Sequence, residues 1–473
     1  MTCQLLWAHR PDNLKVSVLA HRAAAHGHSV SLVDGGYAGP DSLAAAAQSF
    51  GLQSSVQALH SAGSPLQMPR IVLFCGSSIG YPYYAYYAHS LLSLGLIYSH
   101  ADATDITSGI LTDADVLIIP GGFANWGLDR AESHVGVDHA IELFLQKGGA
   151  LIGSCGGAFY ASQGRPGWLG LIDAKPMFTH EYLQTGAAVV NVHLTNTELR
   201  GDLPETLELA YYHGPVYDDR DRLSKTLARY AQYVLPSRLL IDNPLERARY
   251  EALMQGKPAI LESHVTQGRI IVFSPHPEMG DFVRKGIALD GYIRHYLPLR
   301  GFKTMDETLR FYAQEDCLGF RLILNSLLRL GVFNSPPKPT VGIEQTSAPL
   351  IRNDLSSTLT SIRATRQRKS EHLLSRLVTD EPEMATLVQH ELQRQQEQWL
   401  VVGKRIDAYA TTEGADLQVL KELTFTLRDA AAFLESAPDR SVADGVVSLE
   451  LPIRLTAACV RLLHCDEILK ETL

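Results

Sequence analysis

The sequence predicts an α/β protein, a mostly parallel sheet with helices on both faces, followed by an all-α, bundle-like C-terminal domain. Two observations lead to this prediction. Between residues 69 and 300, short apolar runs alternate with stretches of helical periodicity, as in parallel sheets buried under helices. Beyond residue 351, glycine is rare and apolar residues recur at helical spacing. A chain of 473 residues also exceeds what one hydrophobic core usually serves, so several domains are expected.

Residues 1–68 are predicted to form a βα extension of the sheet that follows. Leu14 to His26 has the pattern of a short helix. Ser29 to Val33 alternates like a strand, which a turn-forming Asp-Gly-Gly sequence ends. The segment has no Gly-x-Gly-x-x-Gly turn, so a dinucleotide site is not expected there.

Residues 69–333 are predicted to form the α/β domain. Its buried strands are the apolar runs that precede glycine or a polar turn, namely Ile71–Cys75, Val116–Ile119 and Ala150–Ile152. The helices between them are expected at Tyr84–Leu94 and Val137–Lys147. A second set of runs alternates more, as antiparallel or edge strands do: Val189–Leu194, Leu207–Tyr212, Ala259–Ser263 and Ile270–Phe273. Ligands of such sheets bind outside the carboxyl ends of the strands, so the loops after these runs matter most.

The chain is predicted to turn helical from about residue 301, beginning with Asp306–Leu330. Residues 334–350 form a Pro-rich linker that holds neither a helix nor a central strand. Residues 351–473 are predicted to form four helices, which either pack as a bundle or pair with another subunit. Pro382 and Pro438 fall where helices are expected to begin.

The overall composition excludes several classes of protein. A net charge of −9 gives no electrostatic reason to expect nucleic acid or an anionic membrane as the main partner. The six cysteines include no Cys-x-x-Cys pair and no zinc-like spacing, so neither a disulfide framework nor a metal site is expected. No signal-peptide pattern and no run of about 18 apolar residues occurs. We therefore expect a soluble, cytoplasmic protein without a cofactor.

The strongest local motif is Gly149–Ser162, in which an apolar strand runs into the sequence Gly-Ser-Cys-Gly-Gly and a small-residue helix follows. This strand, turn and helix are typical of a nucleophile elbow, with Cys155 as the nucleophile. The flanking glycines permit a strained turn. At the start of a helix, the amides and the helix dipole favour the thiolate over the thiol. We therefore expect covalent chemistry at Cys155.

A second motif supplies the partners that such a thiol needs. Arg269–Gly280 is an apolar strand that delivers His276 and Glu278 just past its end. A carboxylate two residues after a histidine can orient the imidazole, which can then take the proton of the thiol. Taken alone, His-x-Glu is a common sequence; together with the elbow it predicts a Cys-His-Glu triad.

A third motif, Val116–Gly127, is a strand followed by a Gly-rich loop that begins Pro-Gly-Gly. Backbone amides in such a loop can stabilise an oxyanion. The candidate oxyanion hole consists of the amides of Gly121, Gly122 and Gly156. An ordinary βα turn explains this motif equally well when it is taken by itself.

Together the three motifs resemble the class I glutamine amidotransferase-like superfamily, in which an elbow cysteine, a downstream His-x-Glu and a Pro-Gly-Gly loop converge. Within the superfamily, the chain most resembles the amidotransferase-like domain at the N-terminus of biotin–protein ligases. The opening strand with its loop, Ile71–Tyr87, and the segment Tyr211–Tyr217 add to the likeness, which covers about residues 68–330.

This resemblance implies a flavodoxin-like sheet with Cys155 as nucleophile, His276 as base and Glu278 as its orienter. Glutaminases of the superfamily carry a glutamine four residues after the cysteine, where it helps to hold the substrate; here that residue is Phe159. An apolar wall cannot hydrogen-bond the ammonium or carboxylate of glutamine, and burying those groups unpaired is costly. A different amide, ester or thioester is the expected substrate.

Other side chains are expected to line the substrate pocket with Phe159. They belong to the tyrosine run before the first helix of the α/β domain, to the residues after the Pro-Gly-Gly loop, and to the Tyr-rich segment. These residues are Tyr81, Tyr83, Asn125, Trp126, His213 and Tyr217. The pocket is expected to take a small-molecule or peptide-like substrate.

Two functions stay open at this point. The first is a cysteine-dependent hydrolase or amido/acyl transferase that works through a thioester and does not hydrolyse glutamine. The second is a catalytically silent protein that binds a metabolite or a partner in the same crevice. In either case, residues 351–473 can serve for homo-oligomer assembly or for docking a protein partner, or can simply cover the sheet edge.

Overall fold

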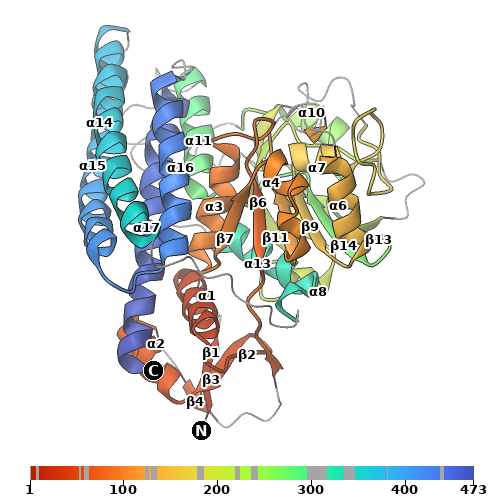
Figure 1. Cartoon of the computed structure of the whole chain (residues 1–473). Coiled ribbons are helices and arrows are strands. Elements are labelled where there is room, and N and C mark those ends of the chain that lie inside the picture. Colours follow the sequence, from red (N-terminus) through yellow and green to blue (C-terminus); the bar gives the residue numbers. More distant parts are fainter. Residues whose placement is uncertain are drawn as a thin grey trace.

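The computed structural model describes residues 2–6, 10–52, 55–57, 63–122, 127–128, 136–177, 186–218, 224–235, 243–295, 317–334, 347–380, 382–436 and 441–473. Within them it confirms the predicted fold class, an α/β sheet domain joined to a helical C-terminal region (Figure 1). No helix in these ranges is both long enough and apolar enough to cross a membrane.

The central sheet has nine strands in the order β11-β10-β12-β13-β14-β9-β8-β6-β7. Five neighbouring strands run parallel. Along the sheet they are β7 (Tyr98–Ala101), β6 (Ile71–Phe74), β8 (Val116–Ile119), β9 (Ala150–Ser154) and β14 (Gly268–Phe273). Numbered along the chain, their order is 2-1-3-4-5, which is the flavodoxin-like arrangement that the resemblance implied.

The other half of the sheet is antiparallel. Its strands are β13 (Pro258–Val265), β12 (Lys225–Tyr230), β10 (Ala187–Leu194) and β11 (Thr206–Tyr212). They include three of the four more alternating runs of the sequence, while the fourth is the parallel strand β14. The sheet is therefore mixed rather than mostly parallel, because β13 pairs with β14 through a tight antiparallel connection that needs no crossover helix.

Helices cover both faces of the sheet (Figure 1). One layer contains α4 (Ala103–Thr107), α6 (Val137–Gln146) and α7 (Gly156–Ala161). The opposite layer contains α3 (Tyr83–Ser93), α11 (Asp281–His295) and α13 (Cys317–Arg329). Shorter elements are α8 (Thr197–Arg200), α10 (Arg247–Leu253) and the 3-10 turns Ile110–Thr112 and Val332–Asn334. Along β6 the buried side chains alternate between the two cores, Ile71 and Leu73 in one and Val72 and Phe74 in the other.

The N-terminal residues form a sheet of their own. The sequence had predicted that they extend the central sheet, which they do not. This antiparallel sheet has the order β4-β1-β3-β2-β5. Its strands are β1 (Thr2–Leu6), β2 (Ser31–Val33), β3 (Gly36–Pro40), β4 (Ser55–Gln57) and β5 (Ser64–Pro65), and its helices are α1 (Arg10–Ala25) and α2 (Ser42–Ser49). The reason is local, because the Asp34-Gly35 turn folds β2 back onto β3 as a hairpin.

The helical region contains α14 (Ala348–Asp380), α15 (Pro382–Thr411), α16 (Leu417–Ser436) and α17 (Val442–Thr472). These are the four helices that the sequence predicted, and Pro382 is the first residue of α15. The first helix starts inside the expected linker, with Pro349 in its first turn, where the missing N–H of proline is not needed. Residues 335–346 of the linker, residues 301–316 and Pro438 lie outside the described residues.

The helical region packs against the rest of the chain. Its last helix, α17, contacts α3 and α11 of the α/β domain as well as α1 and α2 of the N-terminal unit (Figure 1). A buried guanidinium, that of Arg22, binds Asp466 of α17 at 2.7 Å. The ammonium of Lys285 in α11 binds Glu391 of α15 at 2.6 Å. One hydrophobic cluster runs through all three parts of the chain, so the helical region is a structural layer of the molecule.

Candidate active site

The three motifs meet at the carboxyl ends of adjacent parallel strands. Gly121 follows β8, Cys155 follows β9, and His276 lies three residues after β14. Because β9 pairs with β8 on one side and with β14 on the other, these strand ends share one edge of the sheet. This is the edge at which flavodoxin-like sheets bind their ligands.

Cys155 has the strained backbone of a nucleophile elbow. Its φ of 48° and ψ of −101° place it in a region that residues with a side chain rarely adopt. Its neighbour Gly156 fits there only as glycine, since a Cβ atom would lie 2.4 Å from the carbonyl oxygen of Gly122. The half-buried thiol donates to the carbonyl oxygen of Tyr212 at 3.2 Å. The turn thus holds the sulfur at the strand edge and leaves it partly open.

His276 and Glu278 form a buried pair beside this turn. The imidazole Nδ1 lies 2.7 Å from Glu278 Oε1, and each side chain is only 1% exposed. The backbone N–H of His276 donates to the carbonyl oxygen of Ala210 at 2.9 Å, which fixes the residue against β11. The other ring nitrogen, Nε2, is buried and has no hydrogen-bond partner among the described residues. This nitrogen is therefore available to a thiol or to a substrate.

The surroundings of His276 favour its protonated form. Burial alone would lower its pKa, but the negative charges of Glu278 and Cys155 outweigh burial and raise the pKa to about 10. The hydrogen bond from Nδ1 to Glu278 acts in the same direction. The arrangement is that of a protonated imidazole held by a carboxylate beside the cysteine.

The Pro-Gly-Gly loop reaches the same place. A Cβ atom on Gly121 would lie 2.8 Å from Cε1 of His276 and 3.4 Å from Cβ of Cys155. The loop is also tied to the elbow, because the N–H of Gly157 donates to the carbonyl oxygen of Pro120 at 3.1 Å. Gly156 is the first residue of α7, where an N–H has no acceptor inside the helix. The oxyanion hole of Gly121, Gly122 and Gly156 stays a prediction, now with its three members in contact.

Two further residues at the site were not predicted from the sequence. The hydroxyl of Ser154 donates to Oε2 of Glu278 at 3.2 Å. The hydroxyl of Tyr87 in turn lies 2.5 Å from Ser154 Oγ. All three side chains are buried. Ser154 directly precedes the cysteine in the elbow, so the sequence could have predicted that it lies at the site. Nothing in the tyrosine run distinguishes Tyr87 from its neighbours.

The predicted pocket residues fall in different places. Phe159 lies one turn after Cys155 on α7 and packs on Trp168, with the ring centroids 5.6 Å apart. Both rings are buried, and neither belongs to the two large hydrophobic clusters. Tyr81 packs on Phe433 of α16 at 5.3 Å, at the contact with the helical region. Tyr83 packs partly buried against the core under α4 and α6.

The Tyr-rich segment closes the other side of the site. His213 has a φ of 52° and exchanges hydrogen bonds with the backbone of Gly186 through its own N–H and its Nδ1. Tyr217 is buried and lies 3.0 Å from the hydroxyl of Ser162 at the end of α7. Burial and the nearby charge of Cys155 raise its pKa, while the bond to Ser162 opposes this. Asn125 and Trp126 lie outside the described residues.

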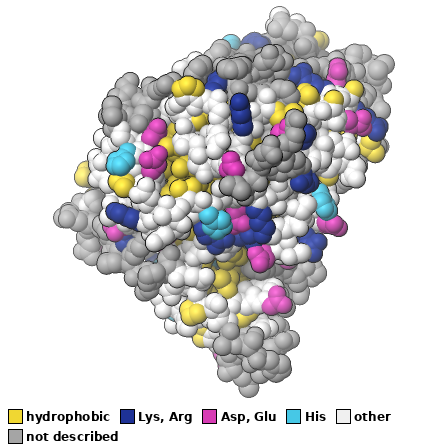
Figure 2. Space-filling view, turned by 90° about the vertical axis from the view of Figure 1, so that its right-hand side faces the viewer, with side chains coloured by type: hydrophobic (Ala, Val, Ile, Leu, Met, Phe, Trp, Pro, Cys, Tyr) yellow, Lys and Arg dark blue, Asp and Glu magenta, His cyan; other side chains and the backbone are white. Residues whose placement is uncertain are grey.

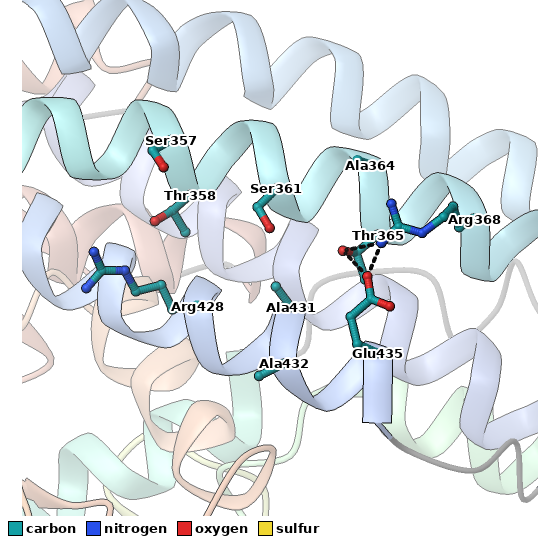
Figure 3. Close-up of a pocket in the computed structure, with 10 residues that line it drawn as sticks. All are labelled: Ser357, Thr358, Ser361, Ala364, Thr365, Arg368, Arg428, Ala431, Ala432 and Glu435. Carbon is teal, nitrogen blue, oxygen red and sulfur yellow. Dashed lines mark hydrogen bonds and ion pairs between the residues drawn. The ribbon is translucent and has the colours of Figure 1, made fainter.

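A separate hollow lies in the helical region. A cavity of about 430 Å³ opens between α14 and α16 and is lined mostly by small and hydroxyl side chains (Figure 3). At one end Glu435 accepts from Thr365 at 2.9 Å and pairs with Arg368. In the described ranges, no group of three His, Cys, Asp or Glu side chains is arranged to hold a metal ion. This hollow therefore offers hydroxyl groups beside a closed ion pair.

Some solved structures are similar to part of this chain. No protein-family model and no curated protein matches the chain. A protein from Thermoplasma acidophilum described as a putative GMP synthase component matches 57% of this chain and 96% of its own, with 15% identity and a TM-score of 0.31. A glutamine amidotransferase from Thermotoga maritima matches 56% of this chain and 98% of its own, with 12% identity and a TM-score of 0.36.

Proposed function

We propose that this chain is a cysteine-dependent hydrolase or amido/acyl transferase of the class I glutamine amidotransferase-like superfamily. One observation carries the proposal: a cysteine held in a strained elbow lies beside a buried histidine that a buried carboxylate orients. Strain at a reactive residue, a base within reach and a third group that orients the base are the features of an activated nucleophile. We also propose that, within this superfamily, the chain is most similar to the N-terminal domain of biotin–protein ligases.

The residues divide the work of acyl transfer. The Cys155 thiolate attacks the carbonyl carbon of the substrate, and the amides of Gly121, Gly122 and Gly156 stabilise the oxyanion. The bond to the leaving group then breaks, and the leaving group takes a proton from His276, which Glu278 orients. Water or an amine next attacks the thioester and gives a proton to His276. Breakage of the C–S bond finally returns the thiolate.

The pocket wall favours an acyl group without charges. Phe159 lies one turn after the nucleophile and packs on Trp168, and neither ring can hydrogen-bond the ammonium or carboxylate of glutamine. A small amide, ester or thioester, or a peptide-like substrate, fits this wall. Acidic and basic side chains lie interspersed on the face drawn in Figure 2, which supports such a substrate over nucleic acid. The described cysteines are free thiols, which supports a reducing compartment such as the cytoplasm.

Selective labelling tests the thiol. Iodoacetamide at pH 7 should alkylate Cys155 at least about ten-fold faster than Cys75, because an activated thiolate reacts and a protonated thiol does not. Burial raises the pKa of Cys75, which makes it a matched control within the same chain. Peptide mass spectrometry measures both rates. Faster labelling of Cys75 would overturn the proposal.

Turnover tests the chemistry. A panel of small amides, esters and thioesters, read out by acylation of Cys155, should identify the substrate class. Cys155→Ala should abolish acylation and turnover while circular dichroism shows an unchanged fold. Turnover that survives in Cys155→Ala would exclude a thioester mechanism.

The second candidate is a silent protein that binds a metabolite in this crevice and assembles or docks a partner through its helical region. The hollow between α14 and α16, whose lining includes no triad residue, supports it (Figure 3). Under this reading Cys155→Ser retains full biological activity. Light scattering of the full chain, compared with Ser361→Trp in the hollow, tests assembly there; an identical mass for both proteins would count against it.

A further inference from the structure

We infer that Tyr87 and Ser154 are positioning residues of the triad: a buried line of hydroxyl groups holds the second oxygen of Glu278. The inference rests on the proposed function and deepens it. From α3 to the imidazole the line runs Tyr87 hydroxyl, Ser154 hydroxyl, Glu278 carboxylate, His276 Nδ1. The successive distances are 2.5, 3.2 and 2.7 Å.

Proton counting fixes the direction of this line. Glu278 accepts from His276 through Oε1, so its other oxygen, Oε2, needs a donor because the group is 1% exposed. Ser154 has a single hydroxyl proton, and it donates that proton to Oε2. Its oxygen is then free to accept from Tyr87, which must donate. Burial, with the charge of Glu278 adding to it, raises the pKa of Tyr87, so this donor stays protonated.

The helix that carries Tyr87 is itself held from outside. One turn earlier on α3, the hydroxyl of Tyr84 donates to Asp429 of α16 at 2.6 Å. The same helix packs along α17. The helical region thus fixes α3, α3 fixes the phenol of Tyr87, and the phenol ends the line that orients Glu278. A tyrosine that merely filled the core would not need a hydroxyl partner at the triad.

Tyr87→Phe tests the inference, because it removes the donor and keeps the ring. With the full chain, iodoacetamide labelling of Cys155 is followed from pH 5 to 10 by peptide mass spectrometry. A less firmly held Glu278 supports the imidazolium less well, so at pH 7 the rate should fall about five-fold, the worth of one hydrogen bond. At the alkaline end, where the thiol ionises without help, the variant and wild type should converge. General loosening of the fold would change the rate at every pH instead.

The matched control is Tyr86→Phe, the same change one residue earlier on α3, where the ring packs on Phe282 at 6.0 Å. It should leave the profile unchanged. Ser154→Ala breaks the same line and should match Tyr87→Phe, and the double variant should be no slower than either single one. A Tyr87→Phe profile identical to that of Tyr86→Phe would overturn the inference, and so would a wild-type profile for Ser154→Ala.

A further variant separates this inference from the proposed function. His276→Gln should slow labelling of Cys155 more than Tyr87→Phe does. If His276→Gln has no effect, the triad itself is absent and the proposed function fails. If His276→Gln slows labelling and Tyr87→Phe does not, the triad stands and the positioning role of Tyr87 and Ser154 falls.

Discussion

At the scale of single residues, His276 is the most informative side chain. It is buried, which should disfavour a charge, yet the charges of Glu278 and Cys155 raise its pKa to about 10. A histidine in this state can donate a proton to a leaving group at neutral pH, which a neutral imidazole cannot do. The raised pKa also makes folding stability depend on pH.

The sign of that dependence follows from proton binding. In the unfolded chain the pKa of histidine is 6.5, and in the folded protein that of His276 is about 10. Its stabilisation is therefore fully present below pH 6.5 and is lost as the pH rises toward 10. We expect the advantage of wild type over His276→Gln in free energy of unfolding to fall across this window, by up to about 1.4 kcal/mol per pH unit.

Urea denaturation at pH 6, 7, 8, 9 and 10 measures this difference. Taking the difference between two proteins cancels the titration of all groups that do not interact with His276. The exposed His264→Gln serves as the control for the substitution itself. A difference that stays flat from pH 6 to 10 would show that the folded imidazole is not held protonated.

The sequence revealed those residues of the site that local motifs mark. Cys155 lies in a strand-elbow-helix pattern, and His276 and Glu278 follow closely after a strand. The neighbouring sequence therefore marks each of them as a site residue. Tyr87 does not, because it meets Ser154 across 67 positions of the chain. One hydroxyl among the five tyrosines between residues 81 and 87 is selected by how α3 packs on the sheet, and periodicity cannot specify that rotation.

At the scale of elements, α11 connects the site to the helical region. It begins at Asp281, three residues after Glu278, and therefore carries the end of the triad loop. One turn into it, Lys285 is buried between Glu391 of α15 and Glu450 of α17. Despite burial, the charges of Lys285 and Arg454 lower the pKa of Glu450. The ammonium thus shares these two buried carboxylates with the guanidinium groups of Arg394 and Arg454.

Lys285→Met tests the importance of this balance. The substitution nearly keeps the length of the side chain and removes its charge, which leaves each buried carboxylate with an arginine as its remaining charged partner. We expect the free energy of unfolding to fall by about 3–5 kcal/mol. Urea denaturation measures it, with Lys257→Met as the matched control, since that lysine forms a partly exposed pair with Asp218 at 3.4 Å. The control should lose at most about 1 kcal/mol, and an equal loss in both variants would contradict the role of the buried cluster.

Element types were easier to predict than their pairing. The apolar runs gave the strands of the sheet because burial on both faces leaves a continuous signal. The prediction for the N-terminal unit was wrong about its sheet. Its strands are short, and the sequence pattern of a strand does not indicate which sheet the strand joins. The turn at Asp34-Gly35 decides this by making a hairpin, and a two-residue turn returns the chain antiparallel.

At the scale of the whole molecule, the two cores differ in reach. The core under α4, α6 and α7 stays within the α/β domain. The other core continues from the sheet through α3 into α17 and on to the N-terminal helices. Buried ion pairs cross the same boundary, with Arg22 bound to both Asp416 and Asp466. A chain shortened before α14 would expose this entire surface, so the helical region is expected to be needed for folding.

Cutting the chain without removing anything tests this expectation. A protease site introduced within residues 335–346 allows the folded protein to be cleaved before α14. Because a shared core and buried ion pairs hold the pieces, both should elute together from size exclusion at the volume of the uncut protein. Labelling of Cys155 should keep its wild-type rate, since α3 and α11 remain covered. The same cut in Lys285→Met should loosen the complex and release part of the helical fragment. Separate elution of the two wild-type fragments would show instead that the helical region is an independent module attached to a self-sufficient α/β domain.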